Sequence, residues 1–107
     1  MNRTDKHQVV RHYVKCYDML IQLAEECNEL SAAILKYLRK DRNENPTPLS
    51  EDEIQKRIEE ECTDVTLCLD VMGRLYVDDK LYDEKLDRWI NRLSEKEKLV
   101  LEDLTND

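Results

Sequence analysis

The chain has very few of the residues that build tight turns and β-sheets. Its 107 residues include one glycine, two prolines and no phenylalanine. This scarcity argues against a fold rich in strands and turns, because such folds need frequent glycine and proline at their corners. Charged residues make up 39% of the chain, whereas aromatic residues make up 6%. This balance is typical of an all-α protein.

Long hydrophobic runs are also missing. No apolar stretch approaches the roughly 20 residues that are needed to cross a bilayer, and the opening segment MNRTDKHQVVRHY lacks the apolar region of a signal peptide. We therefore expect no membrane partner and a cytoplasmic location. The net charge of −8 disfavours binding to nucleic acid, whose phosphates it would repel. The same charge suits a protein that binds a divalent cation.

The four cysteines do not form a CxxC motif. They are Cys16, Cys27, Cys62 and Cys68, and each lies in a segment with helical periodicity. We expect reduced thiols within the core. A zinc site or a disulfide is the alternative, although two neighbouring thiols alone make a poor zinc site.

Hydrophobic periodicity predicts a first helix from about Thr4 to Lys40, with Thr4 or Asp5 as its N-cap. One stripe, polar only at its serine, consists of Val10, Tyr13, Tyr17, Leu20, Ala24, Cys27, Ser31, Ile34 and Leu38. A second stripe consists of Met19, Leu23, Leu30, Ala33 and Tyr37. A helix with two apolar faces packs against neighbours on both sides. The sequence leaves open a break between Tyr13 and Cys16.

The only clear helix breaker is DRNENPTPLS, residues 41–50. Ser50 and Glu53 form a capping box, which predicts the start of a second helix that runs to about Leu75 or Tyr76. Its stripe consists of Ile54, Ile58, Glu61, Val65, Cys68, Met72 and Leu75. A polar break at residues 77–80 then precedes a third helix.

The third helix has one apolar face, which we expect to be buried. That face consists of Tyr82, Leu86, Trp89, Ile90 and Leu93. Residues 95–107 form a tail that continues the helix or frays. We expect residues 1–107 to form a single helical domain, an antiparallel bundle with its core at about residues 4–94.

Two acidic pairs at a spacing of three residues carry most of the information. Glu26 and Glu29 lie as far before the turn near Asn45 as Glu61 and Asp64 lie after it. If the two helices are antiparallel, the four carboxylates lie side by side. They would then repel one another unless a cation lies between them.

Glu26 and Glu61 each take a place within an apolar stripe. An ionised carboxylate that is buried without a partner costs on the order of several kcal/mol. A basic partner, a raised pKa or a bound metal compensates for this cost, so spacing alone leaves open an ion-pair network and a metal site. Glu84 and Asp87 have the same spacing but lie off the apolar face of the third helix, which indicates solvated surface.

The ligand types narrow the choice of metal. Di-iron bundles use Glu-x-x-His pairs, and neither His7 nor His12 follows a glutamate at that spacing. An all-carboxylate set favours Mg²⁺ or Mn²⁺ and therefore phosphate chemistry. Basic side chains near these faces are either solvated surface or ligands for phosphate oxygens. They are Lys36 on the first helix and Lys85, Arg88 and Arg92 on the third.

These residues and their surroundings resemble the MazG-like, all-α nucleoside triphosphate pyrophosphohydrolases, a superfamily that includes dimeric dUTPases and phosphoribosyl-ATP pyrophosphohydrolases. The resemblance covers about residues 18–93. The segments that match are LIQLAEECNELSAAILKYLR, which contains the ExxE motif, IEEECTDVTLCLDVM, which contains the ExxD motif, and the basic segment DEKLDRWINRL. A base-recognition motif is absent, and so is the flanking sequence of the phosphoribosyl-ATP branch, so the base of the substrate is unassigned.

The resemblance implies hydrolysis of a (d)NTP to a monophosphate and pyrophosphate. It assigns the metal to Glu26, Glu29, Glu61 and Asp64. Glu25 would hold a second metal or orient water, and Glu25 or Glu29 would accept the proton of that water. Lys85, Arg88 and Arg92 would stabilise charge on the leaving pyrophosphate.

The two apolar faces of the first helix exceed what one hairpin and one short helix cover. We therefore expect a homodimer or a tetramer, with nucleotide pockets at or near the interface. The competing function is a non-catalytic, acidic helical module that binds or regulates a partner. That module would tolerate Glu61→Gln, whereas an enzyme would lose activity.

Overall fold

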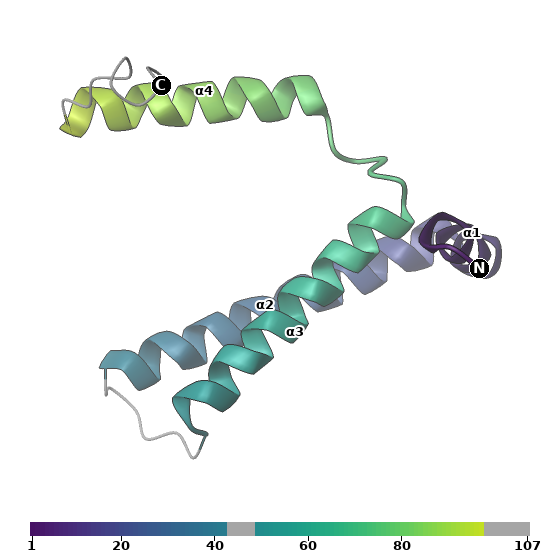
Figure 1. Ribbon diagram of the computed structural model, residues 1–107, viewed down its shortest axis with the longest axis horizontal. Helices are drawn as coiled ribbons and strands as arrows, with labels where there is room; N and C mark the ends of the chain where they lie inside the picture. The colour runs from purple at the N-terminus through teal and green to yellow at the C-terminus, as the bar shows by residue number, and fades with distance from the viewer. Residues whose placement is uncertain (43–48, 98–107) are drawn as a thin grey trace. The chain divides into compact units, whose positions relative to one another are not determined.

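The computed structural model describes residues 1–42 and 49–97. These residues form helices and no strand, which confirms the expected all-α class. The helices are α1 (Arg3–Tyr13), α2 (Cys16–Arg42), α3 (Glu51–Val71) and α4 (Asp79–Glu97), as Figure 1 shows. The predicted turn near Asn45 and the tail beyond Glu97 lie outside the described residues.

The chain divides into two compact units. The first, Met1–Leu75, contains α1, α2 and α3, and the second, Tyr76–Asp107, contains α4. Within the described ranges, no helix combines the length and the apolar character that a bilayer crossing requires.

The expected first helix is two helices, and the break lies at Val14 and Lys15. Val14 is extended (φ −112°, ψ 117°) and packs against the core cluster of Met19, Cys68 and Val71. The expected N-cap was wrong. Asn2 caps α1 by accepting a hydrogen bond from the backbone N–H of Asp5 at 2.8 Å, since asparagine is among the best N-cap residues.

Arg11 holds α1 against the end of α3. Its Nη1 donates a hydrogen bond to the carbonyl oxygen of Val71 at 2.6 Å. The last carbonyls of a helix have no partner within the helix and carry a partial negative charge, so a guanidinium stabilises them. The break at Val14 therefore lets α1 turn so that one of its cations caps a neighbouring helix.

Both ends of α3 have recognisable caps. Ser50 Oγ accepts the N–H of Glu53 at 3.2 Å, which confirms the predicted start. The predicted end at Leu75 or Tyr76 was too late, because Gly73 (φ 65°) and Arg74 (φ 58°) adopt left-handed conformations. Their N–H groups bond to the carbonyls of Asp70 (2.9 Å) and Leu69 (3.0 Å), which is a Schellman motif.

Helices α2 and α3 pack as a hairpin, and the predicted second stripe of α2 lies in its interface (Figure 1). Of that stripe, Met19 and Ala33 are buried, and Leu23 and Leu30 are half-buried. Two members of the α3 stripe, Ile54 and Cys68, are buried as well, as is Val71 next to it. The core of the first unit therefore contains few fully buried side chains.

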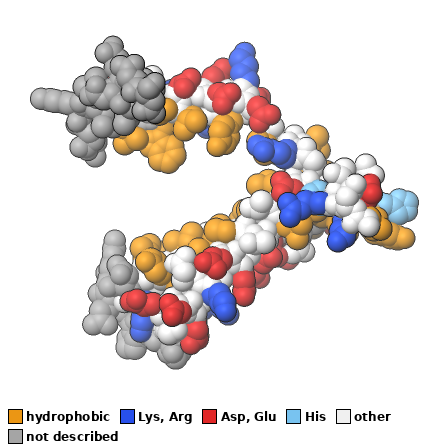
Figure 2. All heavy atoms as spheres, in the orientation of Figure 1, with side chains coloured by type: hydrophobic (Ala, Val, Ile, Leu, Met, Phe, Trp, Pro, Cys, Tyr) orange, Lys and Arg blue, Asp and Glu red, His pale blue; other side chains and the backbone are white. Residues whose placement is uncertain are grey.

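The other stripe of α2 is exposed in this chain. Leu20, Ile34 and Leu38 are each 38–39% exposed. Figure 2 shows hydrophobic side chains along one edge of the hairpin and charged side chains along the other. The α2 helix thus has two apolar faces, as expected, and one of them is exposed within the first unit.

The α4 helix starts at a capping aspartate, with Asp78 Oδ1 accepting the N–H of Leu81 at 3.0 Å. The expectation that its apolar face is buried was wrong for four of the five residues. Tyr82, Leu86, Trp89 and Leu93 are 43–60% exposed, and Ile90 is half-buried. A single amphipathic helix cannot bury its own stripe, so this face needs a neighbour.

Candidate metal centre

Three of the four predicted carboxylates meet between α2 and α3. One ligand oxygen each from Glu26, Glu29 and Glu61 lies within 4.8 Å of the other two. Glu26 and Glu29 lie almost one turn apart on α2, and Glu61 faces them from α3. The symmetric spacing about the turn thus brings the two acidic motifs together, as the sequence predicts.

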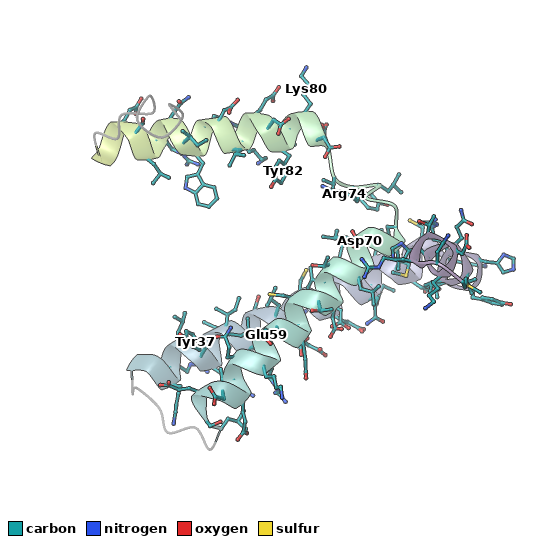
Figure 3. The ribbon with its side chains drawn as sticks, in the orientation of Figure 1. Tyr37, Glu59, Asp70, Arg74, Lys80 and Tyr82 are labelled. Atoms are coloured by element: carbon teal, nitrogen blue, oxygen red, sulfur yellow. The ribbon has the colours of Figure 1, made fainter. Side chains whose placement is uncertain are left out.

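Glu26 and Glu61 keep the inward positions that their places in the apolar stripes predict. Both are half-buried, whereas Glu29 is exposed, so the cluster opens to solvent on the Glu29 side. Glu59, labelled on α3 in Figure 3, is exposed and lies outside the cluster.

Each inward glutamate has one oxygen without a partner. Gln22 Nε2 donates a hydrogen bond to Glu26 Oε1 at 2.6 Å. Glu26 Oε2 and Glu61 Oε2 are buried and accept no hydrogen bond from the described residues. A buried carboxylate oxygen without a donor is costly, so a cation bound to these two atoms would stabilise the fold.

The environment raises the pKa of Glu61 above its ordinary value of 4.5. Loss of solvent around the carboxylate is the largest cause. The negative charge of Glu29 and a hydrogen bond shared with it come next, followed by the charges of Asp64 and Glu26. Each of these favours the neutral acid, so the cluster resists a full set of negative charges.

Asp64, the fourth predicted ligand, is not among the three carboxylates whose oxygens lie within 4.8 Å of one another. It is half-buried, and its charge acts on both Glu61 and Cys68. Asp64 lies almost one helical turn beyond Glu61, and this places it at the edge of the cluster.

The cysteines offer little to a metal here. Cys16, Cys27 and Cys62 are exposed, so the expectation of core thiols was wrong for them; only Cys68 is buried. Burial, followed by the charges of Glu26 and Asp64, raises the pKa of the Cys68 thiol, which therefore stays protonated. The available donors are carboxylate oxygens, the kind that Mg²⁺ and Mn²⁺ prefer.

A cleft of about 350 Å³ continues from the acidic cluster along the hairpin. Its lining residues are Glu29, Ala32, Ala33, Lys36, Arg57 and Glu61. Lys36 is a predicted phosphate ligand, and it shares the cleft with Arg57, which the sequence analysis did not select. The signal was present in the sequence, because Arg57 precedes Glu61 by four residues and so shares its face of the helix.

The remaining predicted residues are described within their own units. Lys85, Arg88 and Arg92 line one hollow on α4, together with Trp89, Asn91 and Glu95. Glu25 is exposed on α2 and does not belong to the cluster of three. Glu84 and Asp87, the acidic pair predicted to be solvated surface, are both exposed.

Comparison of the chain with models of known protein families, with curated proteins and with solved structures finds no match. The site is therefore interpreted from its own geometry and chemistry.

Proposed function

We propose that this protein is a MazG-like, metal-dependent nucleoside triphosphate pyrophosphohydrolase. It would convert a (d)NTP to a nucleoside monophosphate and pyrophosphate, and a housecleaning role in the cytoplasmic nucleotide pool fits this activity. The observation that carries the proposal is the approach of Glu26, Glu29 and Glu61 to within 4.8 Å across two helices. The two orphaned buried oxygens in this cluster support it further.

In this proposal Glu26, Glu29 and Glu61 hold Mg²⁺, or Mn²⁺ in its place, with Asp64 next to them. The cation would neutralise phosphate charge and lower the pKa of an attacking water. Glu29 is exposed at the mouth of the cluster and can accept a proton from that water. Glu25, the preceding acid on α2, is the other candidate for this role.

The phosphate chain needs cations on the protein side. Lys36 lies in the same cleft as Glu29 and Glu61. A basic surface on α4 consists of Lys85, Arg88 and Arg92. We propose that this surface approaches the phosphates in the assembled protein. Positive charge fixed near the leaving pyrophosphate stabilises the charge that develops there.

The exposed apolar faces favour self-association. The outer stripe of α2 is exposed within the first unit, and the apolar face of α4 is exposed within the second. A second copy of the chain would bury them at about 25 cal/mol per Å² of apolar surface. We therefore propose a homodimer or a tetramer with nucleotide pockets at or near the interface, testable by size-exclusion chromatography with light scattering. A 12.8 kDa monomer that turns over nucleotide would contradict it.

The same exposed faces favour one other function, that of a non-catalytic acidic module that binds a partner helix. That module needs no metal, and Glu61→Gln would leave its binding unchanged. The enzyme, by contrast, would lose its activity in this variant with its fold retained.

The test is a panel of canonical and damaged (d)NTPs with Mg²⁺, scored for pyrophosphate release and repeated with EDTA. Glu61→Gln should abolish release, whereas Glu84→Gln, an exposed acid on α4, should not. Absence of metal-dependent release across the panel would overturn the proposed activity.

A further inference from the structure

The cleft between α2 and α3 has two chemically different ends. Glu29 and Glu61 lie at one end, and Lys36 and Arg57 lie at the other. Both cations are nearer the connection between the two helices, because Lys36 follows Glu29 on α2 and Arg57 precedes Glu61 on α3. The antiparallel hairpin therefore gives the cleft a direction, from acidic to basic.

The separation of the two ends follows from helix geometry. Seven residues on α2 and four on α3 correspond to about 10 Å and 6 Å along the helix axes. A lone phosphate would not extend over one to two helical turns, whereas a chain of linked phosphates would. The small side chains of Ala32 and Ala33 also line the cleft and leave room within its volume of about 350 Å³.

The two cations are available to a ligand. Neither Lys36 nor Arg57 forms an ion pair or a side-chain hydrogen bond with any residue that the structure describes. They share the cleft with two glutamates, so the lack of pairing means that the acids and the cations are set apart along it. Arginine binds phosphate oxygens through two parallel N–H groups, and lysine binds them as a point charge.

We infer that Arg57 and Lys36, one from each helix, bind the phosphate chain of the substrate and the pyrophosphate product, while the acidic end holds the divalent cation. This inference rests on the proposed function and adds a ligand-binding residue, Arg57, that the motif did not reveal. It also means that one hairpin supplies groups to both the cation and the phosphates.

The test uses the full chain and inorganic pyrophosphate with Mg²⁺, measured by isothermal titration calorimetry. Arg57→Gln should weaken pyrophosphate binding by about 10- to 100-fold, since a charge-assisted hydrogen bond is worth roughly 1.5–3 kcal/mol. Arg57→Lys should recover part of the affinity. Arg39→Gln is the matched control, because it removes the same charge from an exposed position of α2 outside the cleft.

Two further readouts separate this inference from the proposed function. Titration with Mg²⁺ alone should give the same affinity in Arg57→Gln as in the wild type, and circular dichroism should show an unchanged fold. If Arg57→Gln and Arg39→Gln bind pyrophosphate equally well while the wild type releases pyrophosphate from nucleotides, the inference is wrong and the proposed function stands. A wild-type chain that does not bind Mg²⁺–pyrophosphate overturns the inference whatever the nucleotide panel shows.

Discussion

Divalent cations should raise the thermal stability of this protein far more than monovalent salt does. The reason lies in the acidic cluster, where the oxygens of Glu26, Glu29 and Glu61 lie within 4.8 Å of one another. Glu26 Oε2 and Glu61 Oε2 are buried without a donor among the described residues. A cation that binds there does so only in the folded hairpin, because the two helices must be adjacent. Binding to the folded state alone stabilises it by mass action.

The expected size follows from two general relations. A ligand at 100 times its Kd stabilises the folded state by about 2.7 kcal/mol. For a domain of 60–100 residues, each kcal/mol shifts the Tm by roughly 4–8 °C, so saturating Mg²⁺ should add about 10–20 °C. Monovalent salt should do much less, because the Debye length at 0.1 M is about 10 Å, twice the spacing of the cluster oxygens.

The assay is a thermal melt followed by circular dichroism, titrated with Mg²⁺ or Mn²⁺ and compared with KCl of equal ionic strength. Glu61→Gln should remove the response to the divalent cations. Glu84→Gln should keep it, because this exposed acid has the same i, i+3 spacing to another acid but belongs to no cluster. Equal shifts in MgCl₂ and KCl, or an unchanged Mg²⁺ response in Glu61→Gln, would refute the assignment of the cation to this cluster.

Three other results should follow from the same structure. The pKa of Glu61 is raised in the folded protein, so between pH 4.5 and the raised value the native state keeps a proton that the unfolded state has lost. The free energy of unfolding of the metal-free protein should therefore fall as the pH rises through this window. Urea melts of Glu61→Gln should lack this part of the pH dependence. Arg11→Ala should cost about 1–2 kcal/mol in urea melts by removing the bond to Val71, and a loss no greater than that of Arg39→Ala would contradict the capping role. Ile54→Ala, at a side chain that is only 1% exposed, should lower the free energy of unfolding by about 2–4 kcal/mol. If this variant melts like the wild type, the α2–α3 interface is not the core.

The sequence was sufficient for the hairpin and for most of its acidic cluster. Periodicity placed Met19 and Ala33 in one apolar stripe of the first helix, and both are buried. The positions of Glu26 and Glu61 within apolar stripes predicted inward carboxylates, and both are half-buried with an orphaned oxygen. Side-chain direction on a helix depends only on residue number, so a face can be predicted without knowing the partner.

The predicted helix boundaries were wrong where tertiary contacts or capping interactions determine the end of a helix. The break at Val14 depends on packing against the core cluster and on the bond from Arg11 to the end of α3. The early end of α3 depends on a left-handed Arg74 next to the only glycine. Neither of these is set by the local pattern alone.

Under the proposed function, the groups for the phosphates and those for the base have different origins. A single hairpin brings together the acidic cluster and the cleft with Lys36 and Arg57, so groups for a cation and for phosphates occur in one chain. Apolar side chains such as Tyr37 on α2 and Trp89 on α4 are exposed and could contact a nucleobase. If the protein assembles through those faces, the base pocket forms only in the oligomer. Interface variants should then change nucleotide selectivity more than they change Mg²⁺–pyrophosphate binding, because Lys36, Arg57 and the acidic cluster all lie on one hairpin.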